Sequence, residues 1–244
     1  MNANTKNIAG ARLPLSTKLG YGVGQAADSA GYNLYYTYFL FFLTDVAGIS
    51  PAFAGVVSLI AVSWDAITDP IIGYFSDNCK SKYGRRRPFM IGSALPYALI
   101  IFLLFVSVNF SPGVKNAYYV IMAVLLWTSY TGYVIPYFSI GAEITQDFNE
   151  RNTLRSYATI FMGIAVLLAS AAPVLIADYV VKRGGTMQTG WTAVGAFFAI
   201  FIFIAIVLCW RFTRGREIEI DWSIEKPKQR IIKTYISFDN SLFR

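Results

Sequence analysis

The sequence predicts an all-α membrane protein with six transmembrane helices. Of its 244 residues, 55% are hydrophobic and only 14% are charged, whereas a soluble domain has about 25% charged residues. The apolar residues form six long blocks, and most of the Lys and Arg residues stand between these blocks. These observations exclude a soluble globular domain, a disordered tail and a secreted domain held together by disulfides.

Each apolar block is long enough to cross a bilayer as a helix. A hydrocarbon core of about 30 Å needs roughly 20 residues of helix, because each residue adds about 1.5 Å. We therefore expect one bundle over residues 19–211, between cytoplasmic segments at 1–18 and 212–244. The six expected spans are residues 19–44, 51–76, 88–110, 117–142, 154–178 and 190–210.

The positions of the basic residues predict how the bundle faces the membrane. Cytoplasmic connections carry an excess of Lys and Arg. Of the 21 basic residues, only three fall on the expected outer side, namely Lys115, Lys182 and Arg183. Both termini are therefore expected to be cytoplasmic. Since this distribution accounts for the net charge of +7, we expect a lipid bilayer as the surrounding partner and no nucleic acid.

The composition also argues against an enzyme. The sequence contains no histidine, which excludes a His-based zinc site, a Ser-His-Asp triad and an imidazole proton relay. The glycines at positions 20, 22 and 24 open a membrane helix and follow no strand, so close helix packing explains them better than phosphate binding. We expect no catalytic residue and no organic cofactor.

Two acidic residues interrupt the second span within the string WDAITDP. Asp65 and Asp69 are four residues apart, so they share one helix face near the middle of the membrane. An ionised carboxylate there costs about 2.5–3.5 kcal/mol, and a second one adds to this unless a cation lies between them or one is protonated. Since hard cations prefer oxygen ligands, sodium or a proton fits this pair. Carboxylates that cap polar groups of a neighbouring helix are the alternative.

Further polar residues stand at mid-depth in the first and fourth spans. Asp28 is followed one turn later by Tyr32, and a carboxylate next to a phenol suits the hydroxyls and the apolar face of a sugar. Tyr130 and Thr131 precede Pro136. A proline inside a helix frees a backbone carbonyl one turn earlier, and membrane helices tolerate such breaks where they line a cavity. Lipid-facing or interfacial aromatic residues are the alternative for Tyr32, and plain helix packing is the simpler explanation for the fourth span.

The connection between the second and third spans reads GYFSDNCKSKYGRRRP. Its acidic residue ends one helix and its arginines open the next, so the two groups can pair across the cytoplasmic mouth in one state and part in another. The number of basic residues is equally typical of an ordinary cytoplasmic loop. The candidate gate residues are Gly73, Asp77, Gly84, Arg85 and Arg86.

Six strings occur in order along the chain: TKLGYGVGQ, FLTDVAGIS, WDAITDPIIGYFSD, KYGRRRPF, IPYFSIGAEIT and NERNTLRSY. Together they resemble the glycoside–pentoside–hexuronide:cation symporters, the melibiose-permease-like branch of the major facilitator superfamily. The resemblance implies twelve helices in two six-helix bundles. Substrate binds between the bundles, and the binding site opens to the two sides of the membrane in turn. The chain is then expected to be the amino-terminal bundle of a major-facilitator fold. Its last segment would lead to a seventh helix, and its partner would be the complementary carboxy-terminal half.

The resemblance also implies a cation site. Asp65 and Asp69 match the two acidic residues that bind the coupling cation in this branch. Thr131, which belongs to a matching Tyr–Thr pair of the fourth span, completes the candidate cation-binding set. Val134 stands where the branch has an acidic residue or Asn, so one cation ligand is missing. Both sodium and a proton therefore remain open as the coupling ion.

A sugar site is implied in the same way, with departures. Phe138 stands in place of a tryptophan and Thr159 in place of an arginine. The galactoside-binding set is therefore incomplete, and melibiose is not the expected substrate. The candidate substrate-binding residues are Asp28, Ser29, Tyr32, Tyr130, Phe138 and Thr159.

The expected activity is cation-coupled symport of a sugar or glycoside across the cytoplasmic membrane. Two alternatives remain at this point. The chain would be a truncated, non-transporting membrane protein or a subunit of a complex if no second half accompanies it. It would be a transporter of a non-sugar amphiphile if the altered sugar site reflects another solute, because related proteins with the same acidic pair move lysolipids.

Overall fold

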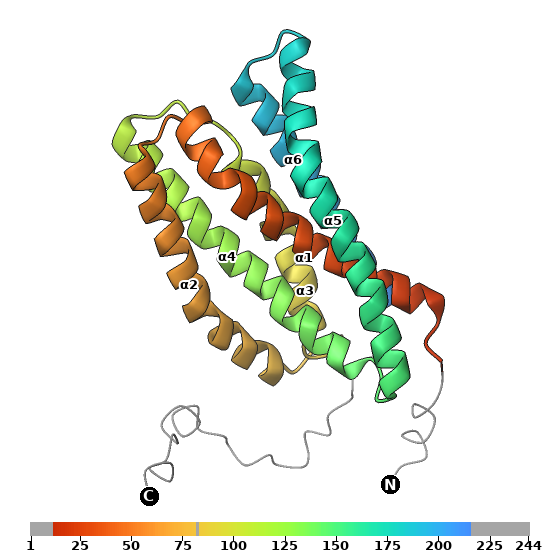
Figure 1. The fold of residues 1–244 in the computed structure, drawn as a ribbon. Helices are drawn as coiled ribbons and strands as arrows, with labels where there is room; N and C mark the ends of the chain where they lie inside the picture. Colours follow the sequence, from red (N-terminus) through yellow and green to blue (C-terminus); the bar gives the residue numbers. More distant parts are fainter. Residues whose placement is uncertain (1–11, 82, 216–244) are drawn as a thin grey trace, which may run out of the picture.

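The computed structural model describes residues 12–81 and 83–215 and shows an all-helical bundle over this part of the chain (Figure 1). Most of the two expected cytoplasmic segments lies outside the described residues. The helices are α1 (Leu15–Phe41), its π-helical continuation η2 (Phe42–Val46), α2 (Pro51–Asn78), α3 (Arg87–Leu104), α4 (Pro112–Glu143), α5 (Phe148–Lys182) and α6 (Met187–Phe212).

Helix boundaries follow local capping chemistry more closely than hydrophobicity. α3 ends at Leu104 although the apolar stretch continues to residue 110, and α4 begins at Pro112. Proline suits the first turn of a helix because its missing N–H would have no partner there. Asp147 caps α5 by accepting a hydrogen bond from the Glu150 N–H at 2.8 Å, and Thr186 caps α6 with a reciprocal capping box.

Five of the helices, α2 to α6, are long and apolar enough to cross a membrane. α1 is not among these five, since polar residues such as Gln25, Asp28 and Ser29 lower its hydropathy. These three side chains are buried inside the bundle. The first expected span therefore exists as a helix, and its polar residues are covered by protein.

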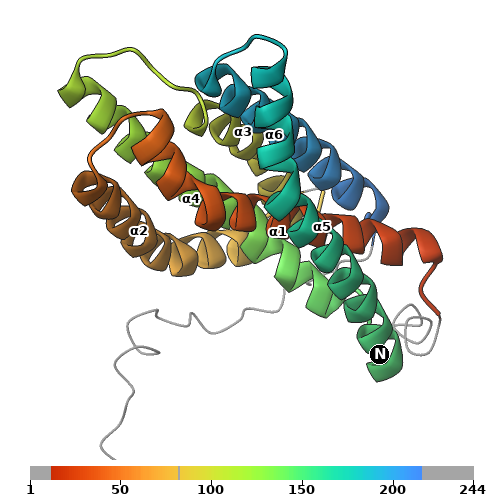
Figure 2. The same cartoon turned by 45° about the horizontal axis from the view of Figure 1, so that its top comes forward.

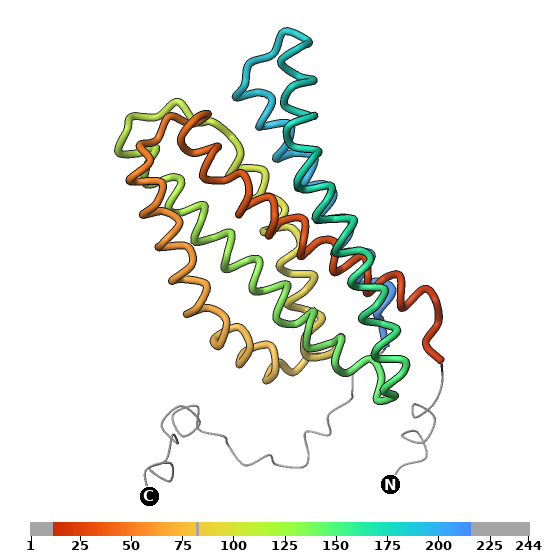
Figure 3. Tube along the Cα trace, in the orientation of Figure 1, coloured from red at the N-terminus to blue at the C-terminus, as the bar shows by residue number. Residues whose placement is uncertain are grey.

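The helices pack in a defined order, which the two ribbon views and the tube show (Figures 1, 2 and 3). α2 lies along α4, and α4 also packs against α3; α3 continues the contact to α6, while α1 packs mainly on α5 and α6. α1 touches α2 and α4 only sparsely. Contacts between α1 and these two helices are therefore made mainly by long side chains and not by close approach of the helix backbones.

The glycines of the first helix allow close approach, as the sequence predicts. A Cβ atom at Gly22 would lie 2.5 Å from the Phe161 ring of α5, and one at Gly24 would lie 2.5 Å from the Cys209 sulfur of α6. Both distances are too short for a real side chain. These glycines thus allow α1 to pack closely against its neighbours, and they do not form a phosphate-binding loop.

The connections rich in basic residues meet at one end of the bundle. Lys18 near the start of α1 pairs with Glu150 near the start of α5 at 2.9 Å, and Arg87 at the start of α3 lies 4.8 Å from the ring centre of Trp210 near the end of α6. At the opposite end, Lys115 donates to the Ala47 carbonyl at 2.9 Å. The six helices therefore run alternately between two ends that differ in charge.

The bundle leaves two of its helices largely uncovered. Only 22% of the most apolar stretch of α2 and of α5 is buried inside the chain, against 50% in α4. Exposed aliphatic side chains continue along both helices, including Leu59 and Leu167. Apolar surface on this scale has to meet lipid or another apolar protein surface.

Candidate functional site

Asp28 lies near the middle of α1 and is only 8% exposed. The Tyr130 hydroxyl of α4 donates to one carboxylate oxygen at 2.7 Å, and the Gln25 amide donates to the other at 2.5 Å. Gln25 also reaches the Ser29 hydroxyl at 3.3 Å. Within the described residues no cation pairs with Asp28. A buried carboxylate is tolerated here because both of its oxygens receive hydrogen bonds.

Gln25 is itself held in place by a second tyrosine of α4. The Tyr137 hydroxyl donates to the Tyr21 carbonyl at 2.9 Å and approaches the Gln25 side-chain oxygen at 3.4 Å. The rings of Tyr21 and Tyr137 stack with their centres 4.6 Å apart. Asp28 is thus the inner end of a buried polar network that joins α1 to α4.

The second acidic site lies on α2. The Thr131 hydroxyl, fully buried on α4, donates to the Asp65 carboxylate at 2.9 Å. Asp69 is partly buried one turn further along α2 and makes no hydrogen bond or ion pair with the residues that the structure describes. The structure therefore joins Thr131 to the first acidic residue of the pair and leaves the second carboxylate available.

The donor atoms at this second site fit a hard cation. Asp65, Asp69 and Thr131 offer only oxygen ligands, which suit sodium, and the two carboxylates alternatively suit a proton. Across the described ranges there is no cluster of three or more His, Cys, Asp or Glu side chains that could hold a metal ion. Any cation here would complete its coordination with hydroxyls, backbone carbonyls or water.

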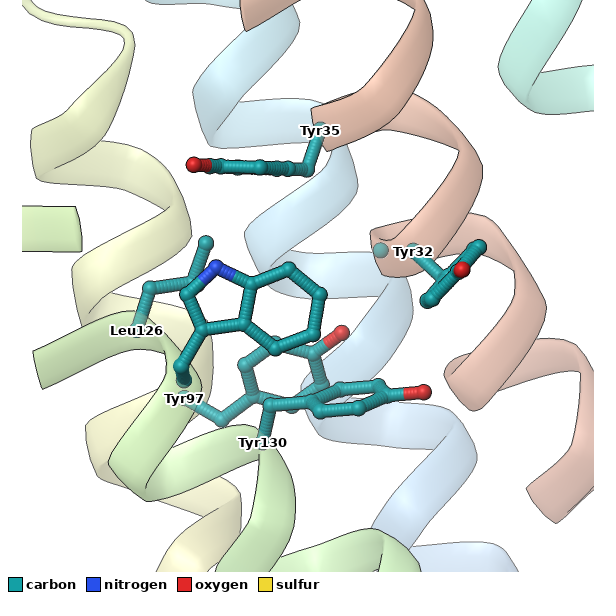
Figure 4. A pocket seen from close by; sticks show the side chains of 7 residues that line it. Tyr32, Tyr35, Tyr97, Leu126 and Tyr130 are labelled. Carbon is teal, nitrogen blue, oxygen red and sulfur yellow. The ribbon is translucent and has the colours of Figure 1, made fainter. Parts of the chain in front are cut away.

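Aromatic rings surround Tyr130 (Figure 4). The ring centres of Trp127 and Tyr130 are 5.2 Å apart, and the Tyr32 ring lies 6.3 Å from Tyr130 and 6.2 Å from Trp127. Tyr32 is 43% exposed, whereas Trp127 is buried. An exposed aromatic face beside a hydrogen-bonded carboxylate is a surface on which a sugar ring can stack.

Two candidate substrate residues make only local contacts. The Phe138 ring is exposed on α4 and lies against its neighbour Tyr137 with ring centres 5.3 Å apart. Thr159 is exposed on α5, and its hydroxyl donates to the Arg155 carbonyl one turn earlier at 3.0 Å. The structure brings neither residue into contact with Asp28 or Tyr130.

The expected gate residues meet at the end of the bundle. Arg86 donates from Nε and Nη2 to one oxygen of Asp77, at 2.9 Å and 2.5 Å. Arg85 and Arg86 also pair with Glu143 at the end of α4, the latter at 2.7 Å. Gly84 has a φ of +99°, a backbone conformation that favours glycine and turns the chain into α3. The resulting cluster links α2, α3 and α4.

Gly73 has no comparable steric role in this conformation. The nearest atom to a Cβ at this position would be a methyl carbon of Ile135, 3.8 Å away, which is an ordinary van der Waals distance. A small side chain would fit here without moving the neighbouring helix.

Gln25, Glu143 and Glu150 take part in these contacts but are not among the candidates that the sequence offers. Glu143 stands in the string IPYFSIGAEIT at the end of the fourth span, and an acidic residue at a basic membrane face was the available signal. Gln25 and Glu150 also lie in motif strings, but nothing about their spacing shows which side chains they contact. Glu150 accepts from Lys18 and from the Leu13 N–H at 3.0 Å.

Comparison with known proteins gives concordant matches. Residues 20–236 match the family model described as MFS/sugar transport protein. The chain is 38% identical over 179 residues to an uncharacterized symporter of Synechocystis. This match covers 71% of this chain and 33% of that protein. It is 29% identical over 204 residues to the inner membrane symporter YicJ of Escherichia coli, covering 84% of this chain and 44% of that protein.

A third relative carries a substrate in its name. The chain is 29% identical over 208 residues to the isoprimeverose transporter of Lactiplantibacillus pentosus, covering 84% of this chain and 43% of that protein. The chain therefore spans between a third and a half of the length of these relatives.

Proposed function

The chain belongs to the MFS/sugar transport protein family, and from this premise we propose that it is the amino-terminal half of a cation-coupled symporter for a sugar or glycoside. The resemblance to the glycoside–pentoside–hexuronide:cation symporters is confirmed, since the relatives are symporters and sugar transporters. The protein is accordingly a multi-pass membrane protein of a transporter family and not an enzyme.

One observation carries the proposal. Tyr130 and Thr131, adjacent on α4, hydrogen-bond to Asp28 of α1 and to Asp65 of α2. We assign the Asp65 side, with Asp69 and Thr131, to the coupling cation. We assign the Asp28 side, with Tyr130 and the exposed face of Tyr32, to the sugar. Ser29 supports the sugar side through Gln25, and Phe138 and Thr159 would reach the substrate only if it extends along α4 and α5.

Coupling follows from the shared helix. A cation at Asp65 and Asp69 removes the repulsion between the two carboxylates, and the Thr131 hydroxyl then turns its oxygen toward the cation. A shift of this helical turn toward the cation would also move the preceding residue, Tyr130, because both belong to one rigid turn. Substrate affinity would then depend on the cation, and by linkage cation affinity would depend on the substrate.

The surroundings proposed for this half follow from its surface. The uncovered faces of α2 and α5 would contact lipid and the complementary carboxy-terminal bundle. The end that holds Lys18, Arg85 and Arg151 would face the cytoplasm, which places both termini there and makes α1 the first of six spans. We assign a gating role to the residues paired at this end, Asp77, Arg85, Arg86 and Glu143.

Gradient-driven uptake tests the proposal. The intact transporter is reconstituted in liposomes, and sugar uptake is measured under an imposed sodium or proton gradient. Asp65→Asn and Asp69→Asn should each reduce gradient-driven uptake to the level without a gradient, and the gradient that drives the unaltered protein identifies the ion. Asp45→Asn is the matched control, because Asp45 is an acidic residue in η2, outside the proposed site.

Each alternative predicts a different result. Unchanged gradient-driven uptake in both variants would overturn the assignment of the cation site. Competition by a lysolipid but by no sugar would favour transport of an amphiphile. Absence of uptake for every solute would favour a non-transporting membrane protein.

A further inference from the structure

A pocket lies between α1, α3 and α4, beside the proposed sugar site (Figure 4). It encloses about 170 Å³, including the part that is open to the outside, and it has room for about one water-sized group. The residues that line it are Gly31, Tyr32, Tyr35, Tyr97, Leu126, Trp127 and Tyr130. Tyr97 is almost completely buried, whereas Tyr32 at the rim is exposed, so the pocket has a buried floor and an accessible edge.

The walls carry buried polar atoms without partners. Among the described residues, neither the Tyr97 hydroxyl nor the Trp127 indole N–H has a hydrogen-bond partner. The Trp127 ring lies edge-on to the Tyr35 ring, with ring centres 5.3 Å apart. Leaving a buried polar atom unpaired costs about 1–3 kcal/mol. Native proteins keep such atoms where a ligand or an ordered water completes them.

Tyr97 reaches the pocket because the facing residue is a glycine. A Cβ at Gly31 would lie 1.8 Å from the Tyr97 hydroxyl oxygen. Any other residue at position 31 would therefore push the phenol away from α1. The fold brings the hydroxyl to this place and leaves it without a partner among the described residues, which indicates a binding role more than a packing role.

We propose that this pocket receives the terminal hydroxyl of the exocyclic hydroxymethyl group of a hexoside, with the methylene at the pocket mouth, and that the Tyr97 hydroxyl forms a hydrogen bond with this terminal hydroxyl. This inference rests on the proposed function and names the class of substrate that the site selects. The methylene contacts Leu126 and the Trp127 ring, while the sugar ring stays at the rim on Tyr32. Ring hydroxyls then lie within reach of Tyr130 and Asp28.

The pocket is suited to a neutral group and rejects a carboxylate. The residues that line it include no Lys or Arg, so the charge of a uronate would enter an apolar site without compensation. Asp28 adds repulsion, because Tyr130 lines the pocket and donates to the Asp28 carboxylate at 2.7 Å. Hexosides are therefore favoured over their 6-carboxylate counterparts and over pentosides, which lack the hydroxymethyl group.

The test compares sugars that differ only at this position. Uptake by the intact transporter is measured for methyl glucoside and methyl galactoside, their 6-deoxy and 6-carboxylate forms, and methyl xyloside. The unaltered protein should prefer one hexoside over its 6-deoxy form by about five- to tenfold, the effect of one buried neutral hydrogen bond. Tyr97→Phe should abolish this preference, and thermal stability should not fall, because the lost hydroxyl has no partner within the described protein.

Tyr119→Phe is the matched control. Tyr119 is also fully buried, but its hydroxyl donates to the Val106 carbonyl at 2.9 Å away from the pocket. This variant should lose thermal stability and keep the sugar preference. Uptake of hexoside and 6-deoxy form at equal rates by the unaltered protein, or an unchanged preference in Tyr97→Phe, overturns the inference and leaves the proposed function standing. If no sugar of the panel is taken up, both fail.

Discussion

Tyr130 and Thr131 are neighbours on α4, yet their hydroxyls donate to carboxylates on two different helices. Tyr130 reaches Asp28 of α1 at 2.7 Å, and Thr131 reaches Asp65 of α2 at 2.9 Å. Successive residues on an α-helix point about 100° apart, because one turn takes 3.6 residues. Two adjacent side chains can therefore contact two separate sites, and any movement of this turn of α4 affects both sites.

Thr131→Val should weaken the response to the coupling ion. Valine has a similar shape but lacks the hydroxyl that donates to Asp65, so we expect the half-saturating ion concentration to rise about tenfold. Gradient-driven uptake at varied ion concentration measures this.

Thr128→Val serves as the control on the same helix. The Thr128 hydroxyl accepts from the Trp64 indole of α2 at 2.8 Å and contacts no carboxylate. An equal change in ion dependence in both variants would show that Thr131 acts through the packing of α2 on α4 and has no direct role at Asp65.

Tyr130→Phe should raise the KM for sugar by about fivefold or more, because one oxygen of Asp28 loses its hydroxyl donor. The half-saturating ion concentration should change little at saturating sugar. Initial rates measured over a grid of sugar and ion concentrations separate the two effects. A shift in ion dependence with an unchanged KM for sugar would contradict the division of the two sites.

Glu143→Gln should open the cluster at the basic end of the bundle. Its carboxylate pairs with both Arg85 and Arg86, and its side chain is only 13% exposed. Removing its charge leaves two guanidinium groups without this partner, which destabilises the paired state. We expect faster maleimide labelling of Cys79, which follows α2 in the same connection and is half-buried.

Cys79→Ser in the same background should abolish that labelling, since Cys209 is fully buried. Glu150→Gln tests specificity: it breaks the Lys18 pair at the α1–α5 contact and should leave Cys79 labelling unchanged. Labelling that rises equally in the Glu143 and Glu150 variants would indicate general loosening of the bundle.

Gly24→Ala should destabilise the bundle by about 1–3 kcal/mol through overpacking. The added methyl group would lie 2.5 Å from the Cys209 sulfur and 2.6 Å from the Tyr137 ring. Thermal unfolding in detergent measures the effect. Gly163→Ala, on α5 with no atom within 4 Å of its new Cβ, should show no loss, and equal loss in both would remove close packing as the explanation.

The sequence marked the acidic residues of both sites as candidates and grouped Thr131 and Tyr130 with them, but it did not show which hydroxyl meets which carboxylate. Asp28, Asp65 and Asp69 stand out because acidic residues are rare in apolar spans. Glu143 lies in a recognised motif, yet its pairing with Arg85 and Arg86 depends on where α4 ends relative to α3. Phe138 and Thr159 were candidates only through the resemblance to the family, and since they make only local contacts in the structure, their roles stay predictions.

By itself, the sequence determined the membrane location, the six helical segments, the alternation of basic and neutral ends, and the family. These properties depend on the polarity of individual residues and on their order, and a bilayer responds to both directly. The tertiary structure alone decided that Tyr130 serves Asp28 while Thr131 serves Asp65, and that Gly31 brings the Tyr97 hydroxyl to a pocket wall. Such contacts depend on the rotation and separation of helices, which are set by the packing of whole faces and cannot be read from the order of residues in any one helix.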